Sequence, residues 1–270
     1  MSRPPRILVI AGSDSSGGAG IQADIKTVTM LGGYAMTAIT AITAQNTLGV
    51  TRVETLSPDM VAAQIEACIG DIGVDAVKIG MLGSAAIVNC VADLLEGVAA
   101  PIVFDPVMIA TSGSVLADED TVAGFERLMG LATVTTPNLP ELAALGGLEA
   151  VRPRTRNLLV KGGHGEGVRI EDKLYAEGGD CSFWSDRIET EHTHGTGCTL
   201  ASAVATGLGA GLALSVAVER GIAFVARAIM AAPRFGGGHG PLGHTLGRVP
   251  FDDALAAPDG AADRQPQSSS

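Results

Sequence analysis

Residues 192–199 (HTHGTGCT) combine a glycine-rich turn with a cysteine, and a long apolar segment rich in Ala and Gly follows them. A glycine-rich turn at the start of a helix offers unpaired backbone N–H groups and the positive end of the helix dipole, which together bind anions. Cys198 at this helix start is expected to have a lowered thiol pKa. The segment therefore predicts an anion site beside a candidate thiolate, and such a pair suggests chemistry at a phosphate.

The same residue types allow a second interpretation, a zinc site formed by His192, His194 and Cys198. These residues suit the metal, but their spacing matches none of the usual ligand patterns. We therefore expect the two histidines to shape the turn rather than to bind a metal.

The elements that must position this site are predicted from short apolar runs. Residues 6–11 are typical of a buried strand of a parallel sheet, and the glycine-rich loop 12–20 leads from it into a predicted helix over 21–31. A short strand is predicted over 53–56. Apolar runs that end in a turn or a polar cluster recur over 37–46, 76–82, 101–108, 132–141 and 158–164. Ligands of open α/β sheets bind at the carboxyl ends of strands, so these ends predict one crevice.

The residues at these strand ends have side chains suited to a nucleotide and a heterocycle. The Gln45 amide can donate and accept, which suits an amino group beside a ring nitrogen, although Gln45 could equally be a plain loop residue. Asp105 is placed for a metal or for phosphate-bound magnesium, with a turn-capping aspartate as the alternative. Asn138 and Glu141 can ligate magnesium directly or through water, and Lys161 can reach a nucleotide phosphate.

Helices are predicted over 60–72, 84–95 and 216–232. Residues 200–218 carry no charge over about the length that crosses a bilayer. Glycines at 207, 209 and 211 interrupt this run, so we expect a helix, a glycine turn and a second helix that begins near Leu214. Both would be buried helices of a soluble domain.

Composition and charge limit the class of protein. The 270 residues suffice for one large α/β domain, and 46% hydrophobic with 17% charged residues indicates a globular chain. The net charge of −11 argues against nucleic acid or an anionic membrane as partner, because both need a basic face. Scattered cysteines and the lack of a signal peptide predict a cytoplasmic location. Residues 258–270 have the composition of a disordered tail, which leaves 1–257 for the folded domain.

Assembled in order, these motifs resemble the hydroxymethylpyrimidine and phosphomethylpyrimidine kinases of thiamine biosynthesis, within the ribokinase-like superfamily. The motifs are residues 11–24 (AGSDSSGGAGIQAD), 44–47 (AQNT), 78–82 (KIGML), 105–108 (DPVM), 136–141 (TPNLPE), 161–164 (KGGH) and 194–199 (HGTGCT). The resemblance covers nearly everything except the tail. It implies a three-layer α/β fold, with a mostly parallel central sheet between helices on both faces and no separate lid domain.

The resemblance also implies the reaction. ATP, with Mg²⁺, would phosphorylate 4-amino-5-hydroxymethyl-2-methylpyrimidine and then its monophosphate to the diphosphate. By this resemblance Gln45 would pair with the aminopyrimidine, and the pyrimidine pocket would also include Gly12, Asp24, Met81 and Val107.

By the same resemblance, Lys161 and Asn138 would serve ATP, and Asp105 and Glu141 would serve the metal. Cys198 stands where many ribokinase-like sugar kinases have an aspartate base, and its thiolate could accept the hydroxyl proton. The alternative for Cys198 is a small buried thiol that merely fits. The anion hole for the transferred phosphoryl group would consist of Gly195, Thr196, Gly197 and Cys198.

The chain departs from the family pattern in two places. Between Glu141 and Lys161 it is shorter than expected, and glycines 146–147 and residues 152–154 stand where a full helix is usual. We expect this crossover to have lost its helix, which could expose the sheet, loosen Asn138 and Glu141, or be covered by a partner subunit. Gly237 stands where family members often have a lysine, so a phosphate contact is expected to be missing.

A homodimer is expected from the resemblance. Two alternative functions remain open from the sequence. Related enzymes accept both rings, so the protein could be a pyridoxal/pyridoxine kinase. The two departures also allow a non-catalytic pyrimidine-binding protein.

Overall fold

The computed structural model describes residues 3–109, 113, 116–165 and 167–248, so the predicted tail and the boundary at 257 lie outside the described residues. A nine-stranded sheet has the order β3-β2-β1-β4-β5-β6-β7-β8-β9. Its strands are β1 (Arg6–Asp14), β2 (Tyr34–Asn46), β3 (Gly49–Thr55), β4 (Ala76–Ile79), β5 (Ile102–Phe104), β6 (Val134–Thr135), β7 (Leu158–Val160), β8 (Arg169–Tyr175) and β9 (Cys181–Asp186).

The central strands are parallel, as the sequence predicts. Neighbours from β2 through β1, β4, β5 and β6 to β7 pair in parallel. Antiparallel strands extend both edges, β3 at one and β8 with β9 at the other. In β1, Ile7 and Val9 belong to the core on one face while Leu8 and Ile10 belong to the core on the other, and all four are completely buried. A strand covered on both faces must be apolar throughout, which explains its unbroken apolar run.

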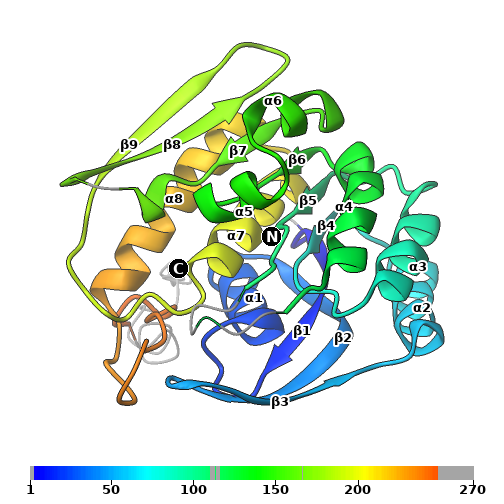
Figure 1. Ribbon diagram of the computed structural model, residues 1–270, viewed down its shortest axis with the longest axis horizontal. Helices are drawn as coiled ribbons and strands as arrows, with labels where there is room; N and C mark the ends of the chain where they lie inside the picture. Colours follow the sequence, from blue (N-terminus) through cyan, green and yellow to red (C-terminus); the bar gives the residue numbers. More distant parts are fainter. Residues whose placement is uncertain (1–2, 110–112, 114–115, 166, 249–270) are drawn as a thin grey trace, which may run out of the picture.

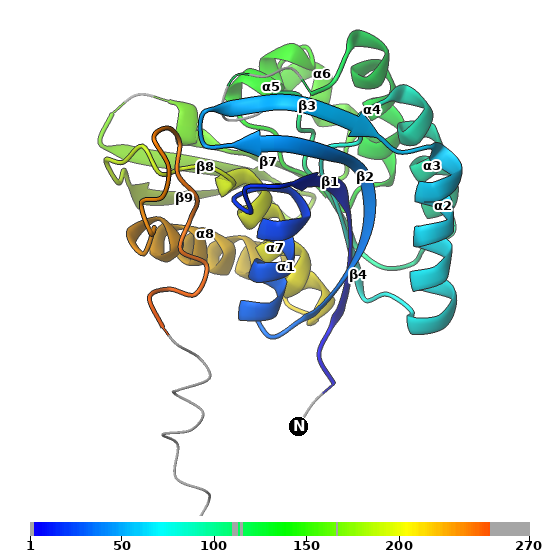
Figure 2. The same ribbon diagram turned by 90° about the horizontal axis from the view of Figure 1, so that it is seen from below.

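Helices cover both faces, so the predicted three-layer fold is confirmed (Figures 1 and 2). One face is covered by α1 (Gly20–Met30), α7 (Thr196–Gly209) and α8 (Leu214–Met230). The other face is covered by α2 (Pro58–Ala67), α3 (Ala85–Leu95), α4 (Glu119–Leu131) and the short helices α5 (Leu139–Ala144) and α6 (Leu148–Val151).

Side-chain caps explain where several helices begin. Ser57, Ser84 and Asp118 each accept a hydrogen bond from a backbone N–H in the first turn of α2, α3 and α4. The predicted helix over 60–72 ends earlier, because α2 passes into a π-helical turn, Cys68–Ile72.

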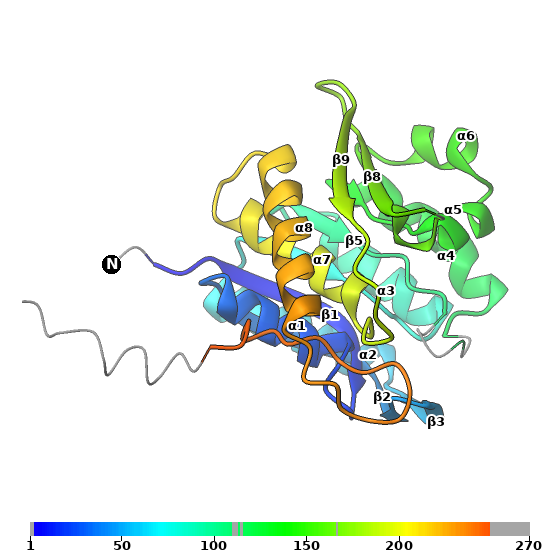
Figure 3. The same cartoon turned by 90° about the vertical axis from the view of Figure 1, so that its left-hand side faces the viewer.

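The sequence analysis did not predict α4 or the β8–β9 hairpin. Both carry signals that could have been used. In α4 the buried Phe125, Leu128 and Met129 follow helical spacing. The hairpin strands flank glycines 178 and 179, which is a turn signal. Figure 3 shows this hairpin extending beyond the helices at its edge of the sheet.

The crossover from β6 to β7 corrects one expectation. It contains no long helix, but α5, α6 and a 3-10 turn (Arg152–Arg154) replace one. Leu145 and Val151 from this segment belong to the core, at 8% and 0% exposure. The segment therefore covers its own part of the sheet, which contradicts the exposed face, one of the three consequences that the sequence left open.

Residues 200–218 divide as predicted, with α7 ending at Gly209 and α8 beginning at Leu214. Gly211 lies between them with φ +82°. Searched over its described residues, the structure has no helix that is both long and apolar enough to span a bilayer.

Candidate active site

A cavity of about 700 Å³ lies at the carboxyl ends of the parallel strands, beside the start of α7. It brings together most of the residues that the sequence nominates. The predicted site residues in its wall are Gly12, Gln45, Met81, Asp105, Val107, Asn138, Glu141, Lys161, Gly195, Thr196, Gly197 and Cys198. Gly237 is exposed and is not among the lining residues.

Asp24 is the exception, and its predicted place in the pyrimidine pocket is wrong. The side chain is completely buried inside the fold and does not line the cavity. Its Oδ2 pairs with Lys78 Nζ at 2.9 Å and its Oδ1 accepts from the Ser202 hydroxyl at 2.6 Å. Helical rotation turns this residue of α1 towards α7 and the sheet rather than towards the cavity.

The turn before α7 has the geometry of an anion site. Gly195 caps the helix with φ +90°, a left-handed conformation that favours glycine. A Cβ on Gly195 would overlap the Gly18 carbonyl oxygen, so the turn packs directly on the loop after β1. The N–H groups of Gly197 and Cys198 belong to the first helical turn, where no intrahelical acceptor exists.

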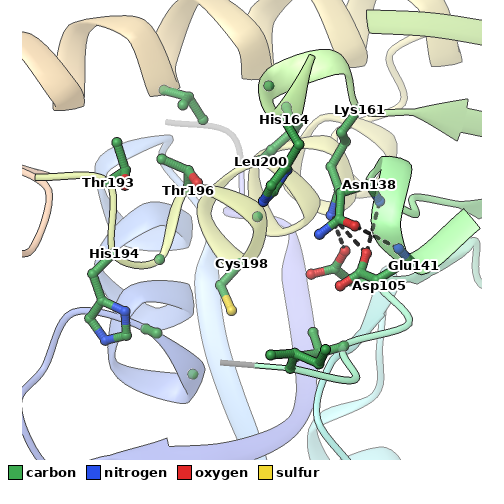
Figure 4. A pocket seen from close by; sticks show the side chains of 18 of the residues that line it. Asp105, Asn138, Glu141, Lys161, His164, Thr193, His194, Thr196, Cys198 and Leu200 are labelled. Atoms are coloured by element: carbon green, nitrogen blue, oxygen red, sulfur yellow. Dashed lines mark hydrogen bonds and ion pairs between the residues drawn. The ribbon is translucent and has the colours of Figure 1, made fainter. Parts of the chain in front are cut away.

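The Lys161 ammonium lies beside this turn, on a side chain that is 11% exposed (Figure 4). A Cβ built on Gly197 would lie 3.3 Å from Lys161 Nζ and 3.6 Å from Asp105 Oδ2. Lys161 Nζ donates to Asp105 Oδ1 at 2.6 Å and lies 3.9 Å from Glu141 Oε2. The Thr136 hydroxyl also donates to Asp105 Oδ1, at 2.9 Å. An anion bound at the helix start would therefore lie close to the Lys161 ammonium, which Asp105 and Glu141 hold in place.

Asn138 and Glu141 reach this cluster by capping α5. The Asn138 side chain accepts from the Glu141 N–H at 2.8 Å, and the Glu141 carboxylate accepts from the Asn138 N–H at 2.8 Å. Burial and the negative charge of Asp105 raise the pKa of Glu141 to about 7, although Lys161 opposes the shift. Glu141 therefore changes charge near neutral pH.

The donor set at this cluster suits a hard cation only in part. Asp105 and Glu141 supply carboxylate oxygens, which Mg²⁺ prefers. Over the described part of the chain, three or more His, Cys, Asp or Glu side chains nowhere gather as a metal site. A magnesium ion here would need phosphate oxygens or water as further ligands, as is usual for nucleotide-bound magnesium. The zinc interpretation of residues 192–198 has no support from this geometry.

Cys198 lies in the cavity wall, but its chemistry differs from the prediction. Burial raises the pKa of its thiol to about 11, and the charges of Asp24 and Asp105 add to the rise while Lys78 opposes it. The prediction of a lowered thiol pKa is therefore wrong. Burial and the charges of the two carboxylates raise the pKa by more than the helix dipole could lower it. At neutral pH this residue is a thiol.

The residues predicted for the pyrimidine pocket that line the cavity are Gly12, Gln45, Met81 and Val107. A Cβ on Gly12 would lie 2.7 Å from Met81 Sδ, so the absence of a side chain there makes room for methionine. The Gln45 amide lies 3.1 Å from Thr43 Oγ1 and 3.3 Å from His194 Nε2.

The sequence analysis named His194 only as a possible zinc ligand or a residue that shapes the turn. In the structure it lines the cavity and pairs with Asp14, the last residue of β1. The sequence analysis missed an apolar group from β8, the loop after β9, α7 and α8 that lines another part of the wall, because no local pattern marks it as a site. Its members are Ile170, Ile188, Leu200, Ile222, Val225 and Ile229.

Residues 14–243 match the family model described as phosphomethylpyrimidine kinase. The chain belongs to the phosphomethylpyrimidine kinase family. The hydroxymethylpyrimidine/phosphomethylpyrimidine kinase of Streptomyces coelicolor is 44% identical to it over 259 residues, covering 89% of this chain and 94% of the relative.

Two solved structures share the fold. The phosphomethylpyrimidine kinase of Clostridium difficile superposes with a TM-score of 0.73 at 37% identity, covering 83% of this chain and 99% of that one. The pyridoxal kinase of Staphylococcus aureus, solved with AMP-PCP and pyridoxal, gives a TM-score of 0.82 at 32% identity, covering 92% and 96%.

These findings confirm the family, the ribokinase-like fold and a phosphotransferase activity in thiamine biosynthesis. Pyridoxal kinase is a structural neighbour and is not better supported. The non-catalytic interpretation has no support among these relatives, which are named as kinases.

Proposed function

We propose that this protein transfers the terminal phosphoryl group of ATP to the hydroxymethyl group of 4-amino-5-hydroxymethyl-2-methylpyrimidine and then to the monophosphate. The observation that carries the proposal is the close approach of Gly197 to Lys161 and Asp105, at 3.3 and 3.6 Å from a built Cβ. A helix start and a lysine thus face the same point of a cavity that also holds Gln45.

Each group has a role that follows from its position. Phosphoryl transfer depends on positioning and charge neutralisation more than on covalent chemistry. The N–H groups of Gly197 and Cys198 and the Lys161 ammonium would bind the transferred group as it moves from ATP to the hydroxyl oxygen. The apolar part of the wall, which includes Leu200 and Val225, offers a surface for the adenine ring.

Cys198 would accept the hydroxyl proton in its thiolate form, late in the transfer. Burial raises the pKa of this thiol to about 11, so only a small fraction of the protein holds the thiolate at neutral pH. In a loose transition state the attacking hydroxyl keeps its proton until the new O–P bond is well formed, so a strong base is not required early. The modest rate contribution of a general base fits this arrangement.

Magnesium would be held by Asp105 and Glu141, with Asn138 beside them. When bound, the ion neutralises charge on the nucleotide phosphates. The Lys161 ammonium pairs with Asp105 at 2.6 Å, so this carboxylate would lie close to both the lysine and the ion. Asn138 and Lys161 would contact ATP.

The test uses purified protein with ATP, magnesium and the hydroxymethylpyrimidine, with ³¹P NMR to follow the product. The expected product is the diphosphate, formed through the monophosphate. The second candidate, a pyridoxal kinase, is suggested by the fold shared with the Staphylococcus aureus enzyme. Absence of turnover with both pyrimidines, or a higher kcat/KM for pyridoxal, would contradict the proposal.

We also propose a homodimer in the cytoplasm. The β2–β3 hairpin supports the dimer, because its exposed side chains include Ile42, Leu48 and Val53 at 51%, 71% and 40% exposure. Among the described residues, the outer strand β3 pairs with β2 alone. A free edge with exposed apolar residues favours pairing with another chain. Analytical ultracentrifugation should give the dimer mass, and a monomer at micromolar concentration would contradict it.

A further inference from the structure

His194 and Asp14 form a buried pair that no role in the proposed reaction requires. Their side chains are 5% and 3% exposed, and His194 Nε2 lies 2.8 Å from Asp14 Oδ2. Asp14 also accepts from Ser16, from the Gly18 N–H at 3.1 Å and from the Ala19 N–H at 2.8 Å. Burial raises the pKa of Asp14, but these hydrogen bonds outweigh it and lower the pKa to about 2. An ionised carboxylate only accepts, so Nε2 of His194 carries a proton.

That proton determines how the Gln45 amide must lie. Atom Nε2 of Gln45 is placed 3.3 Å from Nε2 of His194, which sets two N–H donors against each other. Its Oε1 is placed 3.1 Å from Thr43 Oγ1, whose single proton already has the Ser13 carbonyl oxygen at 3.0 Å as acceptor. Turning the amide over removes both conflicts, because the two ends of an amide are nearly equal in shape. The Gln45 oxygen then faces the His194 Nε2–H, whose single proton it shares with Asp14, and the Gln45 nitrogen donates to the Thr43 hydroxyl.

In the turned arrangement no donor faces another donor. The single Nε2 proton of His194 lies between Asp14 and the Gln45 oxygen, with Asp14 the closer acceptor, while Gln45 donates to the Thr43 hydroxyl and Thr43 donates to Ser13. One N–H and one oxygen lone pair of Gln45 remain unused. A donor beside an acceptor is the pattern that complements an aminopyrimidine edge.

The same histidine also holds the anion turn. Its backbone N–H donates to the Gly240 carbonyl at 3.2 Å, and the next residue, Gly195, caps α7. The imidazole packs on Gly18, where any Cβ would overlap His194 Cδ2. Figure 4 shows His194 on the far side of Cys198 from the Lys161 cluster.

We propose that His194 is a positioning residue that joins pyrimidine recognition to phosphoryl transfer. Its Nε2–H, held by Asp14, locks the Gln45 amide with the oxygen towards the imidazole and the nitrogen towards Thr43, while its main chain fixes the start of the anion turn. This inference rests on the proposed function for its ligand and adds a source of ring specificity to it.

The lock predicts discrimination between two rings. The 4-amino pyrimidine presents an amino donor beside a ring acceptor, whereas the 4-oxo analogue presents an oxygen beside a ring N–H. A Gln45 amide that is free to turn could pair with either ring. A Gln45 amide held in one orientation would place its oxygen against the ring oxygen and its N–H against the ring N–H of the 4-oxo analogue. Unpaired polar groups in a buried site cost enough that wild-type protein should prefer the amino ring by about 100-fold or more.

The experiment measures the dissociation constants of both rings by calorimetry without ATP, for wild type, His194→Leu and His194→Gln. His194→Leu should lose the lock and discriminate by less than about 10-fold. His194→Gln can place an amide N–H near Asp14 and should restore most of the preference. His239→Leu, the same change on an exposed histidine outside the cavity wall, is the matched control and should leave the ratio unchanged. An unchanged ratio in His194→Leu, or no recovery in His194→Gln, would overturn the proposal.

A second measurement does not depend on variant folding. Long-range ¹H–¹⁵N spectra of labelled wild-type protein should show a proton on His194 Nε2, and an Nε2 without one would overturn the lock. Failure of the two ideas is distinguishable. Absence of phosphoryl transfer in a wild-type protein that binds the amino ring would reject the proposed function alone, whereas active protein with an unchanged ratio in His194→Leu would reject this inference alone.

Discussion

Lys78 Nζ lies 2.9 Å from Asp24 Oδ2, and both side chains are completely buried between the sheet and α7. The Ser202 hydroxyl donates to the same carboxylate at 2.6 Å, one helical turn along α7 from Cys198. Burial lowers the pKa of Lys78, but the charges of Asp24 and Asp105 outweigh it, so the net shift is upward and Lys78 stays charged. The buried ion pair therefore places a lysine ammonium and a carboxylate close to the first turns of α7.

Asp24→Asn should lower the free energy of unfolding by about 3–5 kcal/mol, because it leaves the Lys78 charge buried without its partner. Urea denaturation measures the loss. The double variant Asp24→Leu/Lys78→Met removes both charges and should recover most of the stability. A loss under about 1 kcal/mol would mean that the pair is not the buried ion pair seen here.

Gly195→Ala should lower kcat by about 100-fold or more, because the new methyl group overlaps the Gly18 carbonyl and displaces the N–H groups of the anion turn. Gly211→Ala is the matched control. Gly211 also has positive φ, but nothing lies within 4 Å of its built Cβ. It should cost about 1–2 kcal/mol of stability without affecting kcat. Equal kcat values in the two variants would argue against the turn as the phosphoryl site.

Cys198→Ala should lower kcat by about 100-fold and change pyrimidine affinity far less. Because burial raises the pKa of this thiol to about 11, the thiolate fraction in wild type grows with pH across the alkaline range. Wild-type kcat should therefore rise with pH in that range, and the alanine variant should have a flatter profile. Wild-type turnover in Cys198→Ala would exclude a catalytic thiol.

Glu141→Gln should stabilise the protein at pH 8. The folded state holds this carboxyl proton up to a pKa of about 7, against an ordinary value of 4.5. Its stabilising contribution is therefore present below pH 4.5 and is lost as the pH rises through 7, by at most about 3 kcal/mol. Glutamine removes this loss and can still accept the Asn138 N–H.

Thermal unfolding between pH 5 and 8 checks this result, and Glu149→Gln on an exposed position of α6 is the control. A steep pH dependence that survives in Glu141→Gln would assign the titration to another group. If Glu141 also serves magnesium, the variant should need more magnesium for half-maximal rate.

Lys161→Met should lower kcat by about 100-fold to 1,000-fold, with a smaller effect on the KM for ATP, because the ammonium acts on charge that moves during transfer. Lys173→Met makes the same change at a lysine whose ammonium lies 4.9 Å from the Tyr175 ring centroid, outside the cavity wall. That control should keep wild-type kinetics. A rise in KM with unchanged kcat in Lys161→Met would limit Lys161 to ground-state binding.

Patterns of neighbouring residues determine much of this protein. The apolar run of β1 requires a strand covered on both faces, and the glycine-rich turn before Cys198 requires a helix start with free N–H groups. The strand-end residues Asp105 and Lys161 meet because parallel strands bring their carboxyl ends to one edge. The strand and the helix start depend on residues within a few positions of each other, and the meeting of Asp105 and Lys161 follows from the parallel order of the strands, so the sequence alone predicts all three.

Tertiary structure decided the rest. Asp24 faces Lys78 rather than the cavity because the rotation of α1 against the sheet chooses its direction. The thiol pKa of Cys198 rises because burial and the charges of Asp24 and Asp105 come from distant parts of the chain. His194 finds Asp14 across 180 positions of sequence, a separation at which no local pattern records a contact. Side-chain direction, burial and charge environment are properties of the packed fold, and they determine how the predicted residues act.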